Sequence, residues 1–214
     1  MIFYVNDIIK DVRVVIDENV NYDTLSFIND VNTLSLNEII KSKIVAAAMF
    51  THCNAPVHML DGGYNFGESI YWNNDNSGWT LLPEDFLRLV VFQMSDWDYP
   101  LYSAILPDTP EYRKQFSRFK GIKGSPHRPQ CAISIRPDGR ALEFFSCKNN
   151  NATVIRGVYL PYPEIDKKNK KNGIEICERC YQSFVYKTAS LTLLTVGEND
   201  KSIILSELAN NLLL

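Results

Sequence analysis

Apolar residues recur at helical spacing near the beginning of the chain. Ile8, Val12 and Ile16 lie one turn apart and follow Asn6, a residue type that commonly caps helix N-termini. This pattern predicts a helix over residues 7–19.

A second helix is predicted from a capping box. In the segment SLNE, the hydroxyl of Ser35 can accept a hydrogen bond from the backbone N–H of Glu38, and the Glu38 carboxylate can reach back to the N–H of Ser35. The apolar residues that follow share one side of a helix: Leu36, Ile39, Ile40, Ile44 and Ala47. We therefore expect a helix over 36–52.

Helical spacing returns near the end of the chain. One stripe consists of Ile176, Cys180, Phe184, Ala189 and Leu193. It predicts a helix over 175–196 that ends at Gly197, because glycine readily adopts the left-handed conformation of a C-cap. A last helix over 200–213 is predicted from the spacing of Ile203, Ile204, Leu208 and Leu212.

Between these helices, branched and aromatic residues are separated by turn-forming residues. The strands expected from this pattern cover 79–82, 86–94, 131–136, 141–147 and 154–160. Thr109 and Pro110 predict a short capped helical turn. The chain is therefore predicted to be α+β, with a helical bundle built from 1–71 and 172–214 and an inserted β-rich lobe over 72–171.

The stretch PDGRALEFFSCK has two interpretations. Two carboxylates and a lysine are typical of metal-dependent nucleases, in which Asp138 and Glu143 would hold the metal and Lys148 would lie beside the phosphate. Lys148 follows Glu143 by five positions, however, so on a regular strand the two side chains point to opposite faces. Pro137, Asp138 and Gly139 are also typical turn residues, and this favours a hairpin.

The hairpin interpretation makes a packing prediction. Side chains alternate between the two faces of each strand, so one face of the hairpin should be apolar. We expect Ile133 and Ile135 to enter the core of the lobe together with Leu142 or Phe144. A β-bulge would shift this register by one residue.

Several residues could in principle bind a metal or do redox chemistry. Cys177 and Cys180 form a Cys-x-x-Cys, but Cys131 and Cys147 do not supply a second close pair, and a lysine-rich loop rather than a strand precedes Cys177. His52, Cys53, His58 and Asp61 are grouped where a helix is expected to end. Asp96-Trp97-Asp98 resembles a nucleotide-sugar metal motif, although the doubly wound fold of that class is not predicted. We expect no catalytic residues, no cofactor and no bound metal.

Composition narrows the class of protein. The chain has 214 residues, of which 45% are hydrophobic, so it can bury a sizeable core. The net charge of −3 does not favour general nucleic-acid binding. Five cysteines and no recognisable leader argue against a secreted disulfide framework, and the longest apolar run, Ile44–Phe50, is too short to cross a bilayer. We expect a protein that is assembled in a reducing cytoplasm and has no membrane contact.

Charge is strongly segregated along the chain. Residues 113–128, here called the basic arm, contain six Lys and Arg residues, one His and no acidic residue. A second basic stretch lies at 167–171, and without these two segments the remaining charge is −13. A basic arm can contact an acidic surface on the next copy of a chain, and such head-to-tail contacts close into rings if the rotation between copies fits. The arm could instead be a solvated loop of a monomer, or it could contact nucleic acid. Of these, we predict a subunit interface to which Arg113, Arg118 and Lys120 contribute.

Four runs of the sequence resemble one family of phage proteins. They are LLPEDFLRLVVFQMSDWDYP, YRKQFSRFKGIKGSPHRP, RALEFFSC and VYLPYPEID. The chain resembles the head-to-tail connector proteins of tailed bacteriophages, and most of all those of the crAss-like phages of Bacteroides.

This resemblance implies a structural virion protein at the head-tail junction. Its copies would form a ring of twelvefold symmetry beneath the portal, contact the portal protein and neighbouring ring or tail proteins, and let DNA pass through the lumen without sequence-specific binding. The alternative is a nucleic-acid-binding or metal-dependent phage enzyme, in which the basic arm would line a DNA groove.

Overall fold

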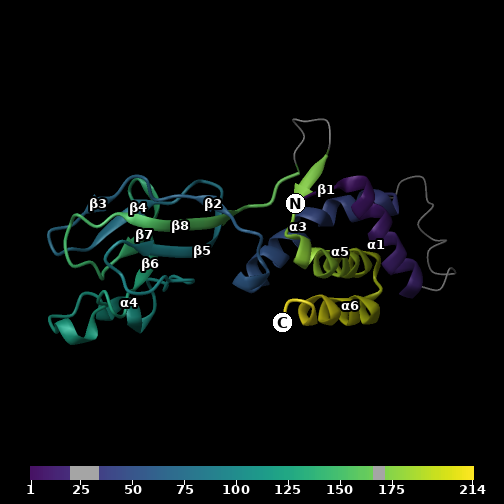
Figure 1. Cartoon of the computed structure of the whole chain (residues 1–214). Helices are drawn as coiled ribbons and strands as arrows, with labels where there is room; N and C mark the ends of the chain where they lie inside the picture. Colours follow the sequence, from purple (N-terminus) through teal and green to yellow (C-terminus); the bar gives the residue numbers. More distant parts are fainter. Residues whose placement is uncertain (20–33, 166–171) are drawn as a thin grey trace. The chain divides into compact units, whose positions relative to one another are not determined.

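The computed structural model describes residues 1–19, 34–165 and 172–214 (Figure 1). It divides into two compact units, a helical unit (Met1–Asp61 with Pro163–Leu214) and a β unit (Gly62–Tyr162). The predicted α+β class, with terminal helices and a central β-rich region, is confirmed. The basic stretch at 167–171 lies outside the described residues.

The boundaries of the two units differ from the predicted ones at 71/72 and 171/172. Strand β2 (Tyr64–Asn65) pairs with strand β8 (Val154–Pro161), which places the residues around 64 with the β-rich lobe. A two-residue strand has no detectable alternation, so the sequence pattern did not indicate this pairing.

The helical unit contains α1 (Val5–Asn19), α3 (Leu36–Asn54), α5 (Tyr181–Val196) and α6 (Asn199–Asn211). Strands β1 (Ile2–Tyr4) and β9 (Gly173–Glu175) pair in an antiparallel ribbon beside them. The fully buried core side chains include Ile8, Ile16, Ile40, Ile44, Phe184 and Leu193. These belong to the predicted stripes of three helices, so the predicted periodicity describes the packed faces of α1, α3 and α5.

Helix ends follow the predicted caps with two exceptions. Ser35 and Glu38 form the complete capping box, and Gly197 ends α5 with a positive φ of 99°. Helix α1 already begins at Val5, so Asn6 lies inside the helix rather than at its cap. The helix predicted from 175 begins as an α-helix only at Tyr181, because residues 173–175 pair with β1 and a 3₁₀ turn, η4 (Glu178–Cys180), follows them.

Helix α6 packs through Leu205 and several small residues, whereas the large apolar residues from which it was predicted stay outside. Its buried residues are Ser202, Leu205 and Ala209, and Leu213 is buried just beyond its end. Ser190 and Ser202 each donate a hydrogen bond to the other's backbone oxygen, which ties α5 to α6. The apolar residues from which the helix was predicted, Ile203, Ile204, Leu208 and Leu212, are all exposed.

The β unit consists of two antiparallel sheets. One has the strand order β3 (Tyr71–Trp72), β4 (Gly78–Leu81), β7 (Gly139–Phe144) and β6 (Cys131–Arg136), and the other has β2, β8 and β5 (Phe86–Met94). Phe92 and Phe144 come from different sheets and their ring centroids lie 6.1 Å apart in the core. The strands predicted at 86–94 and 131–136 have the predicted bounds, whereas the strand predicted over 141–147 ends at Phe144.

The predicted hairpin is present, with one error in its packing. Arg136 pairs with Gly139 across the turn, and Gly139 has a φ of 130°. Ile133 lies opposite Leu142 and packs against the core, as expected. Ile135 is 89% exposed, so its predicted burial is wrong. It pairs with Arg140 at the turn end of the hairpin, beyond the last pair that contacts the core.

The basic arm lies between β5 and β6. It begins within the short helix α4 (Pro110–Lys114) and includes the 3₁₀ turn η3 (Lys120–Ile122). The Thr109 hydroxyl accepts a hydrogen bond from the N–H of Tyr112, and Pro110 occupies the first turn, which confirms the predicted cap.

Candidate functional site

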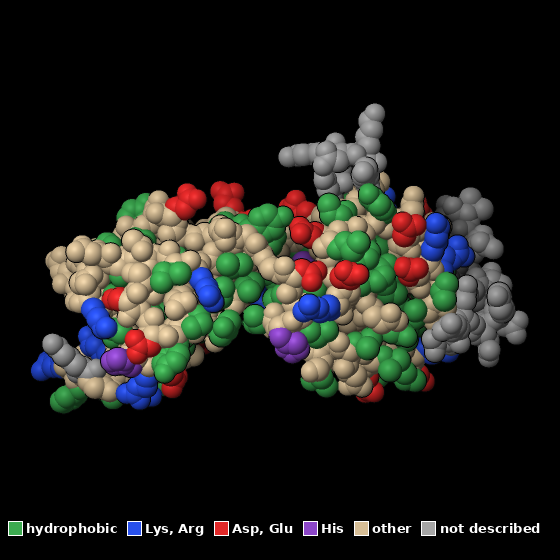
Figure 2. Space-filling view, in the orientation of Figure 1, with side chains coloured by type: hydrophobic (Ala, Val, Ile, Leu, Met, Phe, Trp, Pro, Cys, Tyr) green, Lys and Arg blue, Asp and Glu red, His purple; other side chains and the backbone are tan. Residues whose placement is uncertain are grey.

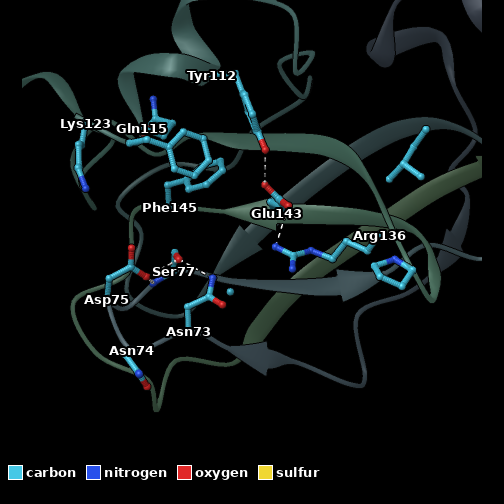
Figure 3. A pocket seen from close by; sticks show the side chains of 14 residues that line it. Asn73, Asn74, Asp75, Ser77, Tyr112, Gln115, Lys123, Arg136, Glu143 and Phe145 are labelled. Carbon is cyan, nitrogen blue, oxygen red and sulfur yellow. Dashed lines mark hydrogen bonds and ion pairs between the residues drawn. The ribbon is translucent and has the colours of Figure 1, made fainter. Parts of the chain in front are cut away.

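Glu143 is a buried carboxylate on β7, on the face of its sheet opposite the apolar core. One of its oxygens, Oε1, accepts hydrogen bonds from the Ser134 hydroxyl (2.7 Å) and from the Arg136 guanidinium (2.8 Å). The other, Oε2, accepts a bond from the Tyr112 hydroxyl at 3.0 Å (Figure 3). Both carboxylate oxygens are therefore engaged by donors of the protein.

An aromatic ring supports the ion pair between Arg136 and Glu143. The Arg136 guanidinium carbon lies 3.9 Å from the centre of the Trp79 ring, and Trp79 pairs directly with Glu143 across β4 and β7. A cation over an indole face is attracted by the negative charge of that face. Burial, followed by the hydrogen bond to Glu143, raises the pKa of Tyr112. Tyr112 therefore remains a protonated donor at neutral pH, and it ties α4 to the sheet.

A cleft of about 600 Å³ opens beside this cluster. Its lining includes Asn73, Asn74, Asp75, Ser77, Tyr112, Gln115, Phe116, Lys123, Arg136, Glu143 and Phe145 (Figure 3). The polar residues on one wall bond to each other. Asp75 accepts hydrogen bonds from the hydroxyl and the N–H of Ser77, which lower its pKa, and Asn73 donates to the Ser77 hydroxyl at 2.8 Å. The cleft therefore has mixed charge and a largely satisfied polar wall.

The three residues of the nuclease interpretation do not line the cleft together. Lys148 is not among the residues lining the cleft, and its backbone N–H donates to the Asp96 carboxylate beyond the end of the strand. Asp138 lies in the exposed turn of the hairpin. The described partners of the Glu143 carboxylate are Ser134, Arg136 and Tyr112.

The cysteine and histidine groups singled out in the sequence have partners within the protein, and Cys177 and Cys180 lie in one buried cluster. Within residues 1–19, 34–165 and 172–214, no three His, Cys, Asp or Glu side chains are arranged to hold a metal. The Cys177 thiol donates to the backbone oxygen of Met59, and Asp61 accepts from the N–H of Glu178. Burial lowers the pKa of His52, so it favours the neutral form. The contacts of Cys177 and Asp61 thus join the segment after α3 to η4.

The acidic motif at 96–98 has structural partners as well. The Asp98 carboxylate contacts the His127 ring nitrogen Nδ1, and the Trp97 ring packs against Phe92 with a centroid separation of 5.6 Å. Together with the bond from Lys148 to Asp96, these contacts fix the turn after β5.

The basic arm is the most exposed functional candidate. Arg113, Arg118 and Arg128 form no ion pair with any side chain that the structure describes. Phe116 and Phe119 are 64% and 75% exposed, and Ile122 is exposed beside them. Figure 2 shows basic and apolar side chains together at this end of the β unit. The side chain of Lys120, the third predicted interface residue, lies outside what the structure describes.

The sequence reasoning missed the cluster of Ser134, Arg136 and Glu143. Strand alternation carries a partial signal, because Ser134 and Arg136 share one face of β6 and Glu143 lies on the same face of β7. Tyr112 is 31 residues away from Glu143, so no local pattern indicates its role.

Comparison with models of protein families gave no match for this chain, and neither did comparison with curated protein sequences. In the described part of the chain, no helix is both long and apolar enough to cross a membrane.

Proposed function

We propose that the protein is a structural subunit of a phage head-to-tail connector, in which its copies form a ring between portal and tail. The observation that carries this proposal is the composition of the basic arm. It combines arginines without a described ion pair with exposed phenylalanines that are close to them in the sequence. Exposed apolar patches with a polar rim are typical of protein-protein interfaces. The sequence resemblance to connector proteins is the reason for proposing a ring on the portal as the assembly that this interface forms.

The candidate site supports a structural role. Glu143 binds Ser134, Arg136 and Tyr112, and through Tyr112 it fixes α4, the helix from which the basic arm extends. The polar cluster thus orients the arm relative to the sheet. An arm held in one orientation loses less conformational freedom on assembly than a mobile one.

The experiment combines the purified protein with its portal protein and images the mixture by electron microscopy. We expect added ring density at one end of the portal, and a charge-reversed variant, Arg113→Glu with Arg118→Glu, should not add it. The melting temperature of the free variant should stay close to that of the native protein, because neither arginine has a described ion pair. Normal assembly of the variant at moderate salt would show that the interface lies elsewhere.

One observation favours nucleic acid as a second candidate partner. Exposed Phe116 and Phe119 could stack on bases while the arginines contact phosphates. Binding of duplex or single-stranded DNA by the isolated subunit, with an affinity that falls steeply as salt increases, would support this candidate. Salt-insensitive or absent binding would argue against nucleic acid as the partner and leave the subunit contact as the proposed role of the arm.

A further inference from the structure

Helix α6 presents a second exposed apolar surface, which we call the α6 face. It consists of Ile203, Ile204, Leu208 and Leu212. Ile204, Leu208 and Leu212 are four residues apart and therefore form one continuous row along the helix. Ile203 and Ile204 are 57% and 55% exposed, values unusual for two consecutive large aliphatic residues in a helix.

The packing of α6 explains why these residues are left outside. The contact with α5 uses Ser183, Ser190, Ser202 and Ala209, and the Ser183 hydroxyl donates to the backbone oxygen of Ala209 at 2.7 Å. Small residues and hydroxyl-to-backbone bonds bring the two helices close together. One side of α6 is thus packed against α5, whereas Ile204, Leu208 and Leu212 lie on a flank of the helix that remains exposed.

The charges near the α6 face are opposite to those of the basic arm. Glu198 and Asp200 lie at the start of α6, and Glu207 is exposed next to Leu208. The one basic residue of this helix, Lys201, is paired with Glu198 at 3.6 Å. The described residues of the helical unit contain 12 acidic and 7 basic residues, so this unit as a whole is negative.

We propose that the α6 face receives the basic arm of a neighbouring copy of the chain. This inference rests on the proposed function and names the second half of its subunit contact. Phe116, Phe119 and Ile122 would cover the row of Ile204 and Leu208, while Arg113 and Arg118 face the acidic residues of the helix. The two patches match in both apolar character and charge.

The alternative of two α6 faces pairing with each other fits these observations less well. It would bring Glu207 of both copies to one contact and would leave the basic arm uncovered. A contact between two different patches also uses each patch once per subunit, which is the arrangement that closes a ring. A homotypic contact alone would stop at a dimer.

The test is a cysteine cross-link between two different variants. Both carry Cys53→Ser, which removes the exposed native cysteine; one adds Phe119→Cys and the other adds Leu208→Cys. The variants are mixed with the portal and oxidised. We expect the mixture to yield a cross-linked dimer, and we expect neither variant to yield one when it is oxidised alone. A cross-link in the Leu208→Cys variant alone would indicate homotypic pairing and overturn the proposal. A single chain that carries both Phe119→Cys and Leu208→Cys serves as a further test. A cross-link formed within this chain at high dilution would also overturn the proposal.

A matched pair of variants separates this inference from the proposed function. Ile204→Asp should reduce ring formation at least tenfold, whereas Val14→Asp, at a similarly exposed position on α1, should assemble like the native protein. If native protein forms rings and Ile204→Asp forms them equally well, the α6 face is not the contact and only this inference fails. If native protein adds no ring to the portal, the proposed function fails with it.

Discussion

The Arg136 guanidinium lies 2.8 Å from the Glu143 carboxylate, and these two residues come from adjacent strands on the face of the sheet that supports α4. Glu143 also accepts the hydrogen bond from Tyr112 on that helix. The ion pair therefore connects the stability of the hairpin to the position of the basic arm.

Removal of either partner of this ion pair should destabilise the protein. The side chains of Arg136 and Glu143 are only 28% and 8% exposed, so Glu143→Ala leaves a poorly solvated cation. We expect a loss of about 3 kcal/mol, at the lower end of the range for buried pairs because Arg136 retains some water contact. Urea unfolding of Glu143→Ala, Arg136→Met and the double variant should give a coupling energy of about 1–2 kcal/mol.

The exposed pair of Glu111 and Lys114 provides the control for this cycle. Its atoms lie 3.5 Å apart and both side chains are more than half exposed, so Glu111→Ala should cost less than about 1 kcal/mol. Equal losses for Glu143→Ala and Glu111→Ala would show that the buried cluster contributes little.

The capping box of α3 should make stability depend on pH. Hydrogen bonds from the Ser35 side chain and backbone lower the pKa of Glu38 below its usual value of 4.5. A lowered folded-state pKa gives stabilisation that is present above the unfolded pKa and disappears as the pH falls through the folded pKa. Native protein should therefore be more stable than Glu38→Gln at pH 7, and the difference should shrink below about pH 4.5.

Chemical unfolding at a series of pH values measures this difference. Glu68→Gln, at an exposed position outside any helix, serves as the control and should show a smaller dependence. A difference between native protein and Glu38→Gln that persists unchanged to pH 3 would contradict the role of the charged carboxylate.

Gly78 should not tolerate a side chain. A Cβ atom there would lie 2.6 Å from the Phe144 ring and 2.6 Å from the backbone oxygen of Tyr71. Because Phe144 is fully buried and Tyr71 is held in β3, Gly78→Ala should cost about 2 kcal/mol or more. Gly121→Ala is the control, since a Cβ there meets no atom within 4 Å. Thermal unfolding measures the difference, and equal melting temperatures of the two variants would disprove the clash.

The elements with strong local signals were predictable from the sequence. The Ser35–Glu38 capping box, the Gly197 C-cap and the strand over 86–94 each follow from residues that are adjacent in the chain. The side of α6 that faces inward was not predictable in this way. Its apolar period suggests one face, but the close serine contacts with α5 select the other, and those contacts depend on tertiary structure.

The candidate site was only partly predictable for a similar reason. Segregated charge marked the basic arm in the sequence, and the structure shows Arg113 and Arg118 exposed. The sequence suggested Asp138 and Lys148 as partners of Glu143, because their spacing is a local feature that a sequence pattern can show. Its bonds to Tyr112 and Arg136 come from the packing of α4 and from the register of β6 and β7.

The mass of the complex that the protein forms on its portal tests the central proposal most directly. A ring of copies adds a whole multiple of the 24.5 kDa subunit mass to the portal, and we expect twelve subunits. Native mass spectrometry should detect this increment with the native protein and lose it with Arg113→Glu combined with Arg118→Glu. A portal whose mass does not change after incubation with native protein would contradict the account.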